Sequence, residues 1–254
     1  MRLRALASDY DDTLATDGAL EASTVAALEE LRGAGFRVLL VTGRVLSDLR
    51  LACPRLDLFD RVVAENGATL YRPGATQRPG ILAPLTEADD RETLLAEPLP
   101  PHALEALRER GVPLFLGRVI VATYVANEPV VREVFRELGL AVSLVRNRSS
   151  LMLLPCLPGA APGADAGPGA AAGAGLVPVD KRSGFLAALD ELSLSAGEVA
   201  GVGDAQNDLP FVTACGLGVA VANALPELKL RAQLVTQAAR GAGVEELIAR
   251  LLAQ

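Results

Sequence analysis

Residues 3–14 have the sequence LRALASDYDDTL, an apolar run that ends in three acidic residues. This pattern is typical of a buried parallel strand that delivers a loop at its carboxyl end. Ligands of parallel α/β sheets bind at that end of the strands. Asp9 and Asp11 are two residues apart and in an extended segment can address the same side, so we expect both to face a ligand crevice. Solvated acids in an ordinary turn are the alternative.

The chain around this motif alternates between strand and helix patterns. Apolar residues at helical spacing follow Ser23 and Thr24, either of which can cap that helix. Short apolar runs predict four further buried strands, at residues 36–41, 61–64, 199–202 and 217–221. The alternation predicts an α/β fold, with a doubly wound, Rossmann-like parallel sheet and helices on both faces.

The pattern changes after residue 72, where prolines become frequent. Helices are predicted at 102–110 and 128–138, and strands at 113–125, 141–146 and 151–154. We therefore expect one core domain, residues 1–80 and 177–254, interrupted by an inserted α+β domain, residues 81–157. Residues 158–176 are nearly all proline, alanine and glycine, which predicts a flexible loop.

Composition excludes several classes of function. The 254 residues include 31 acidic and 24 basic side chains, and with a formal net charge of −7 we expect no nucleic-acid partner. His102 is the only histidine, so catalytic triads and multi-histidine zinc sites lack their residues. This amino-acid composition favours a mechanism that uses carboxylate side chains.

Cysteine usage and hydropathy bear on localisation. Cys53, Cys156 and Cys215 show neither paired nor metal-type spacing, which favours a reducing compartment. The first residues contain no apolar signal core. Residues 209–226, the longest uncharged stretch, contain two prolines and predict a helix, a turn and a strand rather than a membrane span. We expect a cytoplasmic protein without a membrane partner.

A second acidic motif, GVGDAQND, occupies residues 201–208. Asp204 and Asp208 follow a predicted strand, so they can face the first acidic pair. Mg²⁺ takes oxygen ligands, and a few carboxylates from separate strands suit it. An N-cap role is the alternative for Asn207 or Asp208.

Two further features suit an anionic ligand. Thr42-Gly43-Arg44 follows a predicted strand, and a hydroxyl, a permissive glycine and free amides at a helix start form an anion site, although an ordinary cap has the same pattern. Lys181 is one of two lysines and begins a predicted helix. Its ammonium group can neutralise phosphate oxygens and crowded carboxylates. A surface lysine is the alternative, and Lys229 has the features of one.

These motifs, taken in order, resemble the four signatures of the haloacid dehalogenase superfamily. They are DxDxTL at residues 9–14, TGR at 42–44, the helix-start Lys181, and GDxxND at 203–208. The insertion after the second motif, together with ENGA at 65–68, resembles the type IIB, Cof-like phosphatases, whose cap domain lies there.

The resemblance implies a role for each motif residue. It implies that Asp9 attacks phosphorus and that Asp11 serves as acid and then base. Mg²⁺ is then held by Asp9, the backbone carbonyl of Asp11 and Asp204, with Asp208 as a ligand through water or in support. The phosphoryl oxygens are held by Thr42, the Gly43 amide, Lys181 and Asn207.

The implied activity is hydrolysis of a small phosphorylated metabolite, with a sugar phosphate or phosphoglycolate as the leading substrates. A phosphomannomutase-like phosphotransferase and a non-catalytic, receiver-like module are the alternatives. Asp12 stands where the family usually has glycine, and we expect it to point away from the metal. Gln206 stands where a carboxylate is common. His102, Arg118, Arg146 and Arg148 are candidate substrate contacts, each with surface charge as the simpler interpretation.

Overall fold

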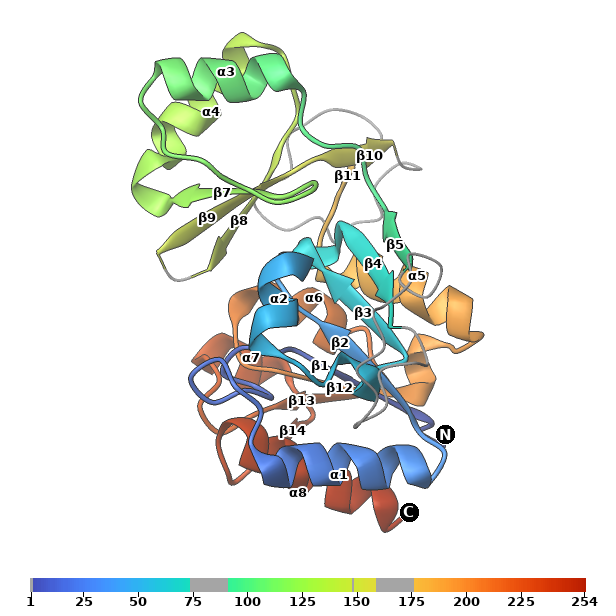
Figure 1. Cartoon of the computed structure of the whole chain (residues 1–254). Coiled ribbons are helices and arrows are strands. Elements are labelled where there is room, and N and C mark those ends of the chain that lie inside the picture. Colours follow the sequence, from blue (N-terminus) through green and yellow to red (C-terminus); the bar gives the residue numbers. More distant parts are fainter. Residues whose placement is uncertain (1, 74–90, 148, 159–175) are drawn as a thin grey trace.

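The computed structural model describes residues 2–73, 91–147, 149–158 and 176–254, and its centre is an eight-stranded sheet (Figure 1). The strand order is β14-β13-β12-β1-β2-β3-β4-β5. Strands β14 to β3 run parallel, whereas β4 is antiparallel to β3 and β5 to β4. The strands are β1 Ala5–Ser8, β2 Arg37–Val41, β3 Arg61–Ala64, β4 Thr69–Arg72, β5 Arg91–Leu94, β12 Val199–Gly203, β13 Leu217–Ala220 and β14 Leu234–Val235.

Helices cover both faces of this sheet. Parallel connections are right-handed, and the chain moves in opposite directions from β1 to β2 and from β12 to β13, so α1 and α6 lie on opposite faces. Figure 1 shows α1 and α8 side by side, and α5 packs against β3, β4 and α6. The helices are α1 Ala22–Gly33, α2 Leu46–Ala52, α5 Lys181–Leu192, α6 Leu209–Val212, α7 Pro226–Arg231 and α8 Arg240–Leu252. The predicted α/β class is confirmed.

A second, four-stranded antiparallel sheet lies between β5 and β12 in the chain, with strand order β6-β7-β9-β8. Two helices pack on it and share a separate apolar core that includes Leu107, Val131 and Leu153. The elements are α3 Pro101–Glu109, α4 Glu128–Glu137, β6 Phe115–Leu116, β7 Val121–Tyr124, β8 Ser143–Asn147 and β9 Ser150–Leu154. Strands β10 Cys156–Pro158 and β11 Leu176–Pro178 pair on the return path.

The sequence locates the core strands correctly, because strands buried on both faces form continuous apolar runs. The predicted cap of the first helix is wrong. Helix α1 begins after Glu21 without a side-chain cap, and the buried Thr24 hydroxyl instead donates to Glu245 Oε1 over 2.7 Å. The single strand predicted at 113–125 is two short strands, β6 and β7, separated by residues 117–120.

The structure describes only some of the residues near the predicted boundaries of the inserted domain. Strand β5 belongs to the eight-stranded sheet, although the sequence assigns residues 81–157 to the insertion. The predicted flexible loop, residues 158–176, lies mostly outside the described residues. Among the helices that the structure describes, none has the length and apolar character needed to cross a bilayer.

Candidate active site

The carboxyl ends of three neighbouring strands bring the predicted site residues together. Strand β1 pairs in parallel with β12 and with β2, and Ser8 lies opposite Val202 and Leu40. Asp9 therefore leaves the sheet beside the GD of the second acidic motif and close to Thr42, although these segments are far apart in sequence. Asp9, Thr42 and Asp204 are all buried.

Three buried carboxylates form the floor of the site. Carboxylate oxygens of Asp9, Asp204 and Asp208 lie within 4.8 Å of one another. Burial, followed by the charge of Asp208, raises the pKa of Asp9 well above its ordinary value. The same two causes raise the pKa of Asp204 to about 6. Crowded, desolvated carboxylates of this kind gain stability from a cation, and their hard oxygen donors fit Mg²⁺.

Lys181 supplies one positive charge to this floor. Its Nζ donates to Asp9 Oδ1 over 2.5 Å and to Asp208 Oδ1 over 2.6 Å. Burial alone would lower the pKa of Lys181, but the charges of Asp208 and Asp9 outweigh it and raise the pKa. The lysine therefore stays protonated in the interior and is not a surface residue.

The position of Lys181 depends on a helix cap and a close backbone contact. Asp180 caps α5, since its Oδ1 accepts from the Ser183 amide over 2.9 Å while Ser183 Oγ accepts from the Asp180 amide. The turn after β3 packs against this cap: a Cβ on Gly67, where φ is +103°, would lie 1.8 Å from the carbonyl oxygen of Asp180. Lys181 thus begins α5, as predicted, directly above the carboxylates.

The Asp208 carboxylate stabilises the loop at residues 203–208 through hydrogen bonds and is not among the residues that line the pocket. Its Oδ2 accepts from the backbone amides of Asp204 and Ala205, each over 2.9 Å, and its Oδ1 accepts from Lys181. A Cβ on Gly203 would lie 2.6 Å from Cβ of Asp208, so glycine is required there. These contacts fix the carboxylate of Asp204 and the ammonium of Lys181 relative to each other.

Hydrogen-bonding groups of the predicted phosphate ligands surround the floor. The Thr42 side chain is fully buried, and its Oγ1 accepts from the Arg44 amide over 3.1 Å. Asn207 Nδ2 donates to Asn66 Oδ1 over 3.2 Å. Within the described residues, Asn66 Nδ2 and Asn207 Oδ1 are buried without a hydrogen-bond partner. Buried polar atoms normally have a partner, so these two are suited to a ligand.

Asp11 lies at the rim, where Arg44 holds it. The guanidinium group donates from Nε to Asp11 Oδ2 over 2.7 Å and from Nη2 to Oδ1 over 2.6 Å. The same group stacks over the Tyr10 ring, 5.3 Å from its centroid. Arg44 is therefore an ion-pair partner of the predicted acid.

The four-stranded sheet closes the site from above. A pocket of about 390 Å³ lies between the two sheets, with Asn147, Ser149 and Met152 of the β8–β9 hairpin on one side. The opposite side consists of core residues: Asp9, Asp11, Asp12, Gly43, Arg44, Lys181, Asp204, Ala205 and Asn207. Met152 Cε would lie 3.3 Å from a Cβ on Gly43, so glycine lets the hairpin approach the core.

Glu65 joins the two parts of the chain. This fully buried carboxylate accepts three backbone hydrogen bonds of 2.8 Å, from the amides of Arg118, Val119 and Ile120. Glu65 and Asn66 both have positive φ, near 50°, so the turn after β3 is strained where it meets the inserted domain. One charged side chain thus attaches the loop between β6 and β7 to the core.

The candidate substrate contacts of the inserted domain lie elsewhere. Arg146 pairs with Glu128 over 2.6 Å and Arg118 with Glu92 over 3.4 Å; both arginines are largely exposed. His102 is exposed in α3 and Gln206 in the turn before α6, and neither lines the pocket. Arg148 lies outside the described residues.

Sequence reasoning missed Asn147, Ser149 and Met152, since no spacing marks them. It also missed the contacts of Glu65 and Asn66. The Asn-Gly pair at residues 66–67 signalled the turn but not what the turn binds.

The sequence model of the haloacid dehalogenase-like hydrolases matches residues 6–77 and 178–248, more than half of the chain. This chain belongs to that family. The matched segments are the two halves of the core that carry Asp9, Thr42, Lys181 and Asp204, and the segment between them contains the four-stranded sheet.

Relatives extend the similarity across the cap. A phosphoglycolate phosphatase of Methanothermobacter thermautotrophicus is 28% identical over 98% of this chain and 99% of its own. A phosphoglycolate phosphatase of Methanopyrus kandleri is 30% identical over 96% of this chain and 95% of its own. A crystallised sugar phosphatase of haloacid dehalogenase subclass IIB has the same fold, with a TM-score of 0.68, 16% identity, and coverage of 99% and 100% of the two chains. The chain is a phosphatase of the haloacid dehalogenase type.

Proposed function

We propose that this phosphatase uses Mg²⁺ to hydrolyse the phosphate monoester of a small metabolite, through an aspartyl phosphate on Asp9. The observation that carries the proposal is the buried group of Asp9, Asp204 and Lys181 at the end of a pocket. Phosphoryl transfer needs a positioned nucleophile and neutralised phosphate charge more than it needs covalent machinery, and this group offers both.

Asp9 is the proposed nucleophile. Lys181 binds its Oδ1, and within the described residues no hydrogen bond occupies Oδ2. Oδ2 attacks phosphorus, and the bond to the ester oxygen breaks as the phosphoaspartate forms. Splitting one displacement into two lowers the barrier of each.

Asp11 is the proposed acid and base. It gives its proton to the departing ester oxygen and then takes a proton from the water that attacks the phosphoaspartate. In the described structure its carboxylate is bound by Arg44 through two hydrogen bonds, which fix the orientation of Asp11 at the rim of the site. The second attack returns Asp9 as a carboxylate and releases inorganic phosphate.

Asp9, the carbonyl oxygen of Asp11 and Asp204 are the proposed Mg²⁺ ligands, with Asp208 in support. When bound, the ion supplies positive charge to the phosphoryl oxygens and the crowded carboxylates. The remaining phosphate contacts come from the chain itself: the Thr42 hydroxyl, the Gly43 amide, the Lys181 ammonium and the Asn207 amide. Asn66 Nδ2, a buried donor without a hydrogen-bond partner among the described residues, supplies a further hydrogen bond to phosphate.

Phosphoglycolate is the first substrate we propose, and a small sugar phosphate the second. Both relatives described above, which match almost the whole chain, are phosphoglycolate phosphatases. The pocket of about 390 Å³ suits a small leaving group, and Asn147 and Ser149 offer it neutral hydrogen bonds. A phosphotransferase with the same core would differ by needing a bisphosphate activator and releasing little inorganic phosphate.

A screen of phosphorylated metabolites with Mg²⁺, read as phosphate release, tests the proposal. Asp9→Asn should lower the turnover of the best substrate by about 10³-fold or more while leaving the fold intact. The matched control is Asp190→Asn, which changes an exposed aspartate of α5 and should retain activity. Full activity in Asp9→Asn would refute the nucleophile, and release that depends on an added bisphosphate would favour the phosphotransferase.

A further inference from the structure

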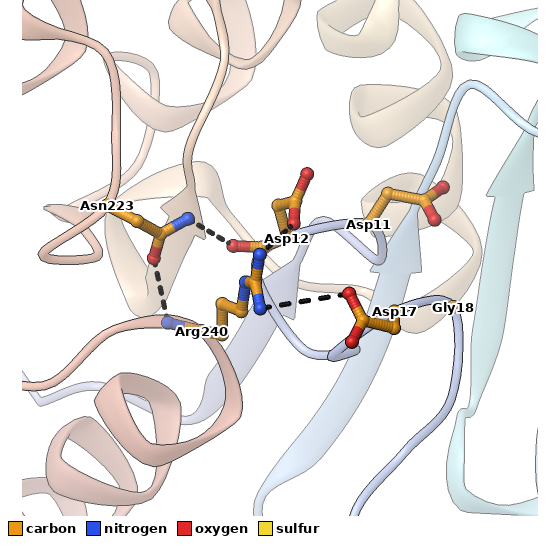
Figure 2. Close-up of a pocket in the computed structure, with 6 residues that line it drawn as sticks. All are labelled: Asp11, Asp12, Asp17, Gly18, Asn223 and Arg240. Atoms are coloured by element: carbon orange, nitrogen blue, oxygen red, sulfur yellow. Dashed lines mark hydrogen bonds and ion pairs between the residues drawn. The ribbon is translucent and has the colours of Figure 1, made fainter.

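Asp12 directly follows Asp11 and has an unusual backbone conformation for a residue that is not glycine. Its backbone has φ of 57°, in the left-handed region that favours glycine. The residue therefore keeps a conformation suited to glycine while adding a carboxylate one position after Asp11. Asp12 lines the pocket that also contains Asp9 and Asp204, and it also lines a second pocket together with Asn223 and Arg240, which Figure 2 shows.

Arg240, which is distant from Asp12 in the sequence, forms an ion pair with the Asp12 carboxylate. Its guanidinium Nη2 lies 3.1 Å from Asp12 Oδ1, as Figure 2 shows. Arg240 is the first residue of α8 and also has a left-handed backbone, with φ of 54°. Two non-glycine residues in unfavourable conformations thus meet across the site rim.

The Asn223 side chain forms hydrogen bonds with the backbones of both Asp12 and Arg240 (Figure 2). Its Nδ2 donates to the carbonyl oxygen of Asp12 over 2.8 Å, and its Oδ1 accepts from the Arg240 amide over 2.8 Å. Asp17, the other acid near the guanidinium, is 4.0 Å away with a side chain that is 90% exposed, so it competes weakly. The contacts direct Arg240 to Asp12.

We infer that Arg240 is a positioning residue whose guanidinium neutralises Asp12 at the rim, so that the pocket can receive a phosphate dianion despite the additional carboxylate. The inference rests on the proposed function, because it concerns charge at that phosphate and metal site. The residues involved do not touch the reacting atoms. Their effect is electrostatic, and it acts on an anion and a cation in opposite directions.

The inference is tested by measuring the binding of an anion, phosphate, and of a cation, Mg²⁺, which should change in opposite directions. Arg240→Met removes the guanidinium charge that faces Asp12, and at low ionic strength this should weaken inhibition by inorganic phosphate about three- to ten-fold and tighten Mg²⁺ binding by a similar factor. Phosphate inhibition is read from the substrate kinetics, and Mg²⁺ binding by calorimetry without substrate. A purely structural role for Arg240 would weaken both affinities.

Asp12→Asn in the Arg240→Met background separates charge from folding. Asparagine tolerates the left-handed backbone and carries no charge, so the double variant should regain both wild-type affinities. Arg250→Met is the matched control, since it removes another arginine of α8 that pairs with Glu246 on the surface. Both affinities should be unchanged in that variant.

The outcomes distinguish this inference from the proposed function. Three results would overturn the inference and leave the proposed function intact. Arg240→Met could weaken the affinities for phosphate and Mg²⁺ together, it could change neither affinity, or Asp12→Asn could fail to reverse its effect. A wild-type protein that binds no Mg²⁺ and hydrolyses no phosphate ester would overturn both.

Discussion

The ammonium group of Lys181 donates a hydrogen bond to the carboxylate of Asp208 over 2.6 Å, and both side chains are almost completely buried. Asp208 in turn accepts from the amides of Asp204 and Ala205. The lysine therefore stabilises the loop that presents Asp204, in addition to contacting Asp9. Removing a charge from such a pair leaves a buried, uncompensated partner, which typically costs 3–5 kcal/mol.

Lys181→Met should lower the free energy of unfolding by about 3 kcal/mol and abolish most of the activity. Urea denaturation gives the first quantity and phosphate release the second. Mg²⁺ should restore part of the lost stability, because a bound cation compensates the carboxylates. Arg182→Met, at the adjacent exposed position, is the control and should unfold like the wild type. Equal midpoints for both variants would contradict a structural role for the ammonium.

Asp204 should make the metal-free protein less stable as pH rises. Burial, followed by the charge of Asp208, raises its pKa to about 6 from 3.8. Between these values the folded protein holds a proton that the unfolded chain has released, so this contribution to stability is complete below pH 3.8 and lost as pH rises through 6. The raised pKa of Asp9 acts in the same direction.

The difference in unfolding free energy between the wild type and Asp204→Asn isolates this effect. In EDTA, we expect the wild type to lose stability relative to the variant between about pH 4 and pH 7. Saturating Mg²⁺ should reverse the order at pH 7, since a ligand that binds the folded state stabilises it. A difference that does not change with pH would show that the pKa of Asp204 is not raised.

Glu65→Gln should loosen the attachment of the cap. The carboxylate accepts three backbone hydrogen bonds, and hydrogen bonds to charged groups contribute about 1.5–3 kcal/mol each. Glutamine offers a single acceptor oxygen and turns an NH₂ group toward the remaining amides. We expect faster hydrogen exchange at residues 118–120 and a several-fold higher KM.

Arg118→Ala is the control for this effect, because Arg118 contributes its backbone amide to Glu65 while its largely exposed side chain pairs with Glu92 instead. That variant should keep slow exchange at Val119 and Ile120. If exchange rises equally in the two variants, the carboxylate does not hold the loop.

Arg44→Lys should slow the reaction without destabilising the protein. Lysine cannot reproduce the two-bond fork to Asp11, so the acid loses its fixed orientation. We expect kcat/KM to fall by about 10- to 100-fold. Exposed ion pairs contribute only about 0–1 kcal/mol, so the melting temperature should barely change.

Arg37→Lys is the comparison for Arg44, since Arg37 makes a single exposed bond to Asp60 away from the pocket. It should retain full kcat/KM. An unchanged kcat/KM in Arg44→Lys would mean that the two hydrogen bonds from Arg44 to Asp11 do not contribute to catalysis.

The sequence by itself determined the core and its chemistry. Strands buried on both faces must be apolar, and acids that follow them lie at the ligand edge of a parallel sheet, so Asp9 and Asp204 could be predicted to converge. Lys181 could be predicted as well, since few lysines occur in the chain and this one begins a helix.

Only the tertiary structure decided what surrounds those residues. Thr24 was one of two candidate helix caps but binds Glu245, and Arg146 was a candidate substrate contact but binds Glu128. Three arrangements depend on how distant segments pack: Glu65 with residues 118–120, Asn147 in one pocket with Lys181, and Arg240 beside Asp12. Local sequence records the periodicity of an element and the residues of its ends, whereas contacts between elements depend on side-chain packing and charge pairing across the whole fold, which no local pattern encodes.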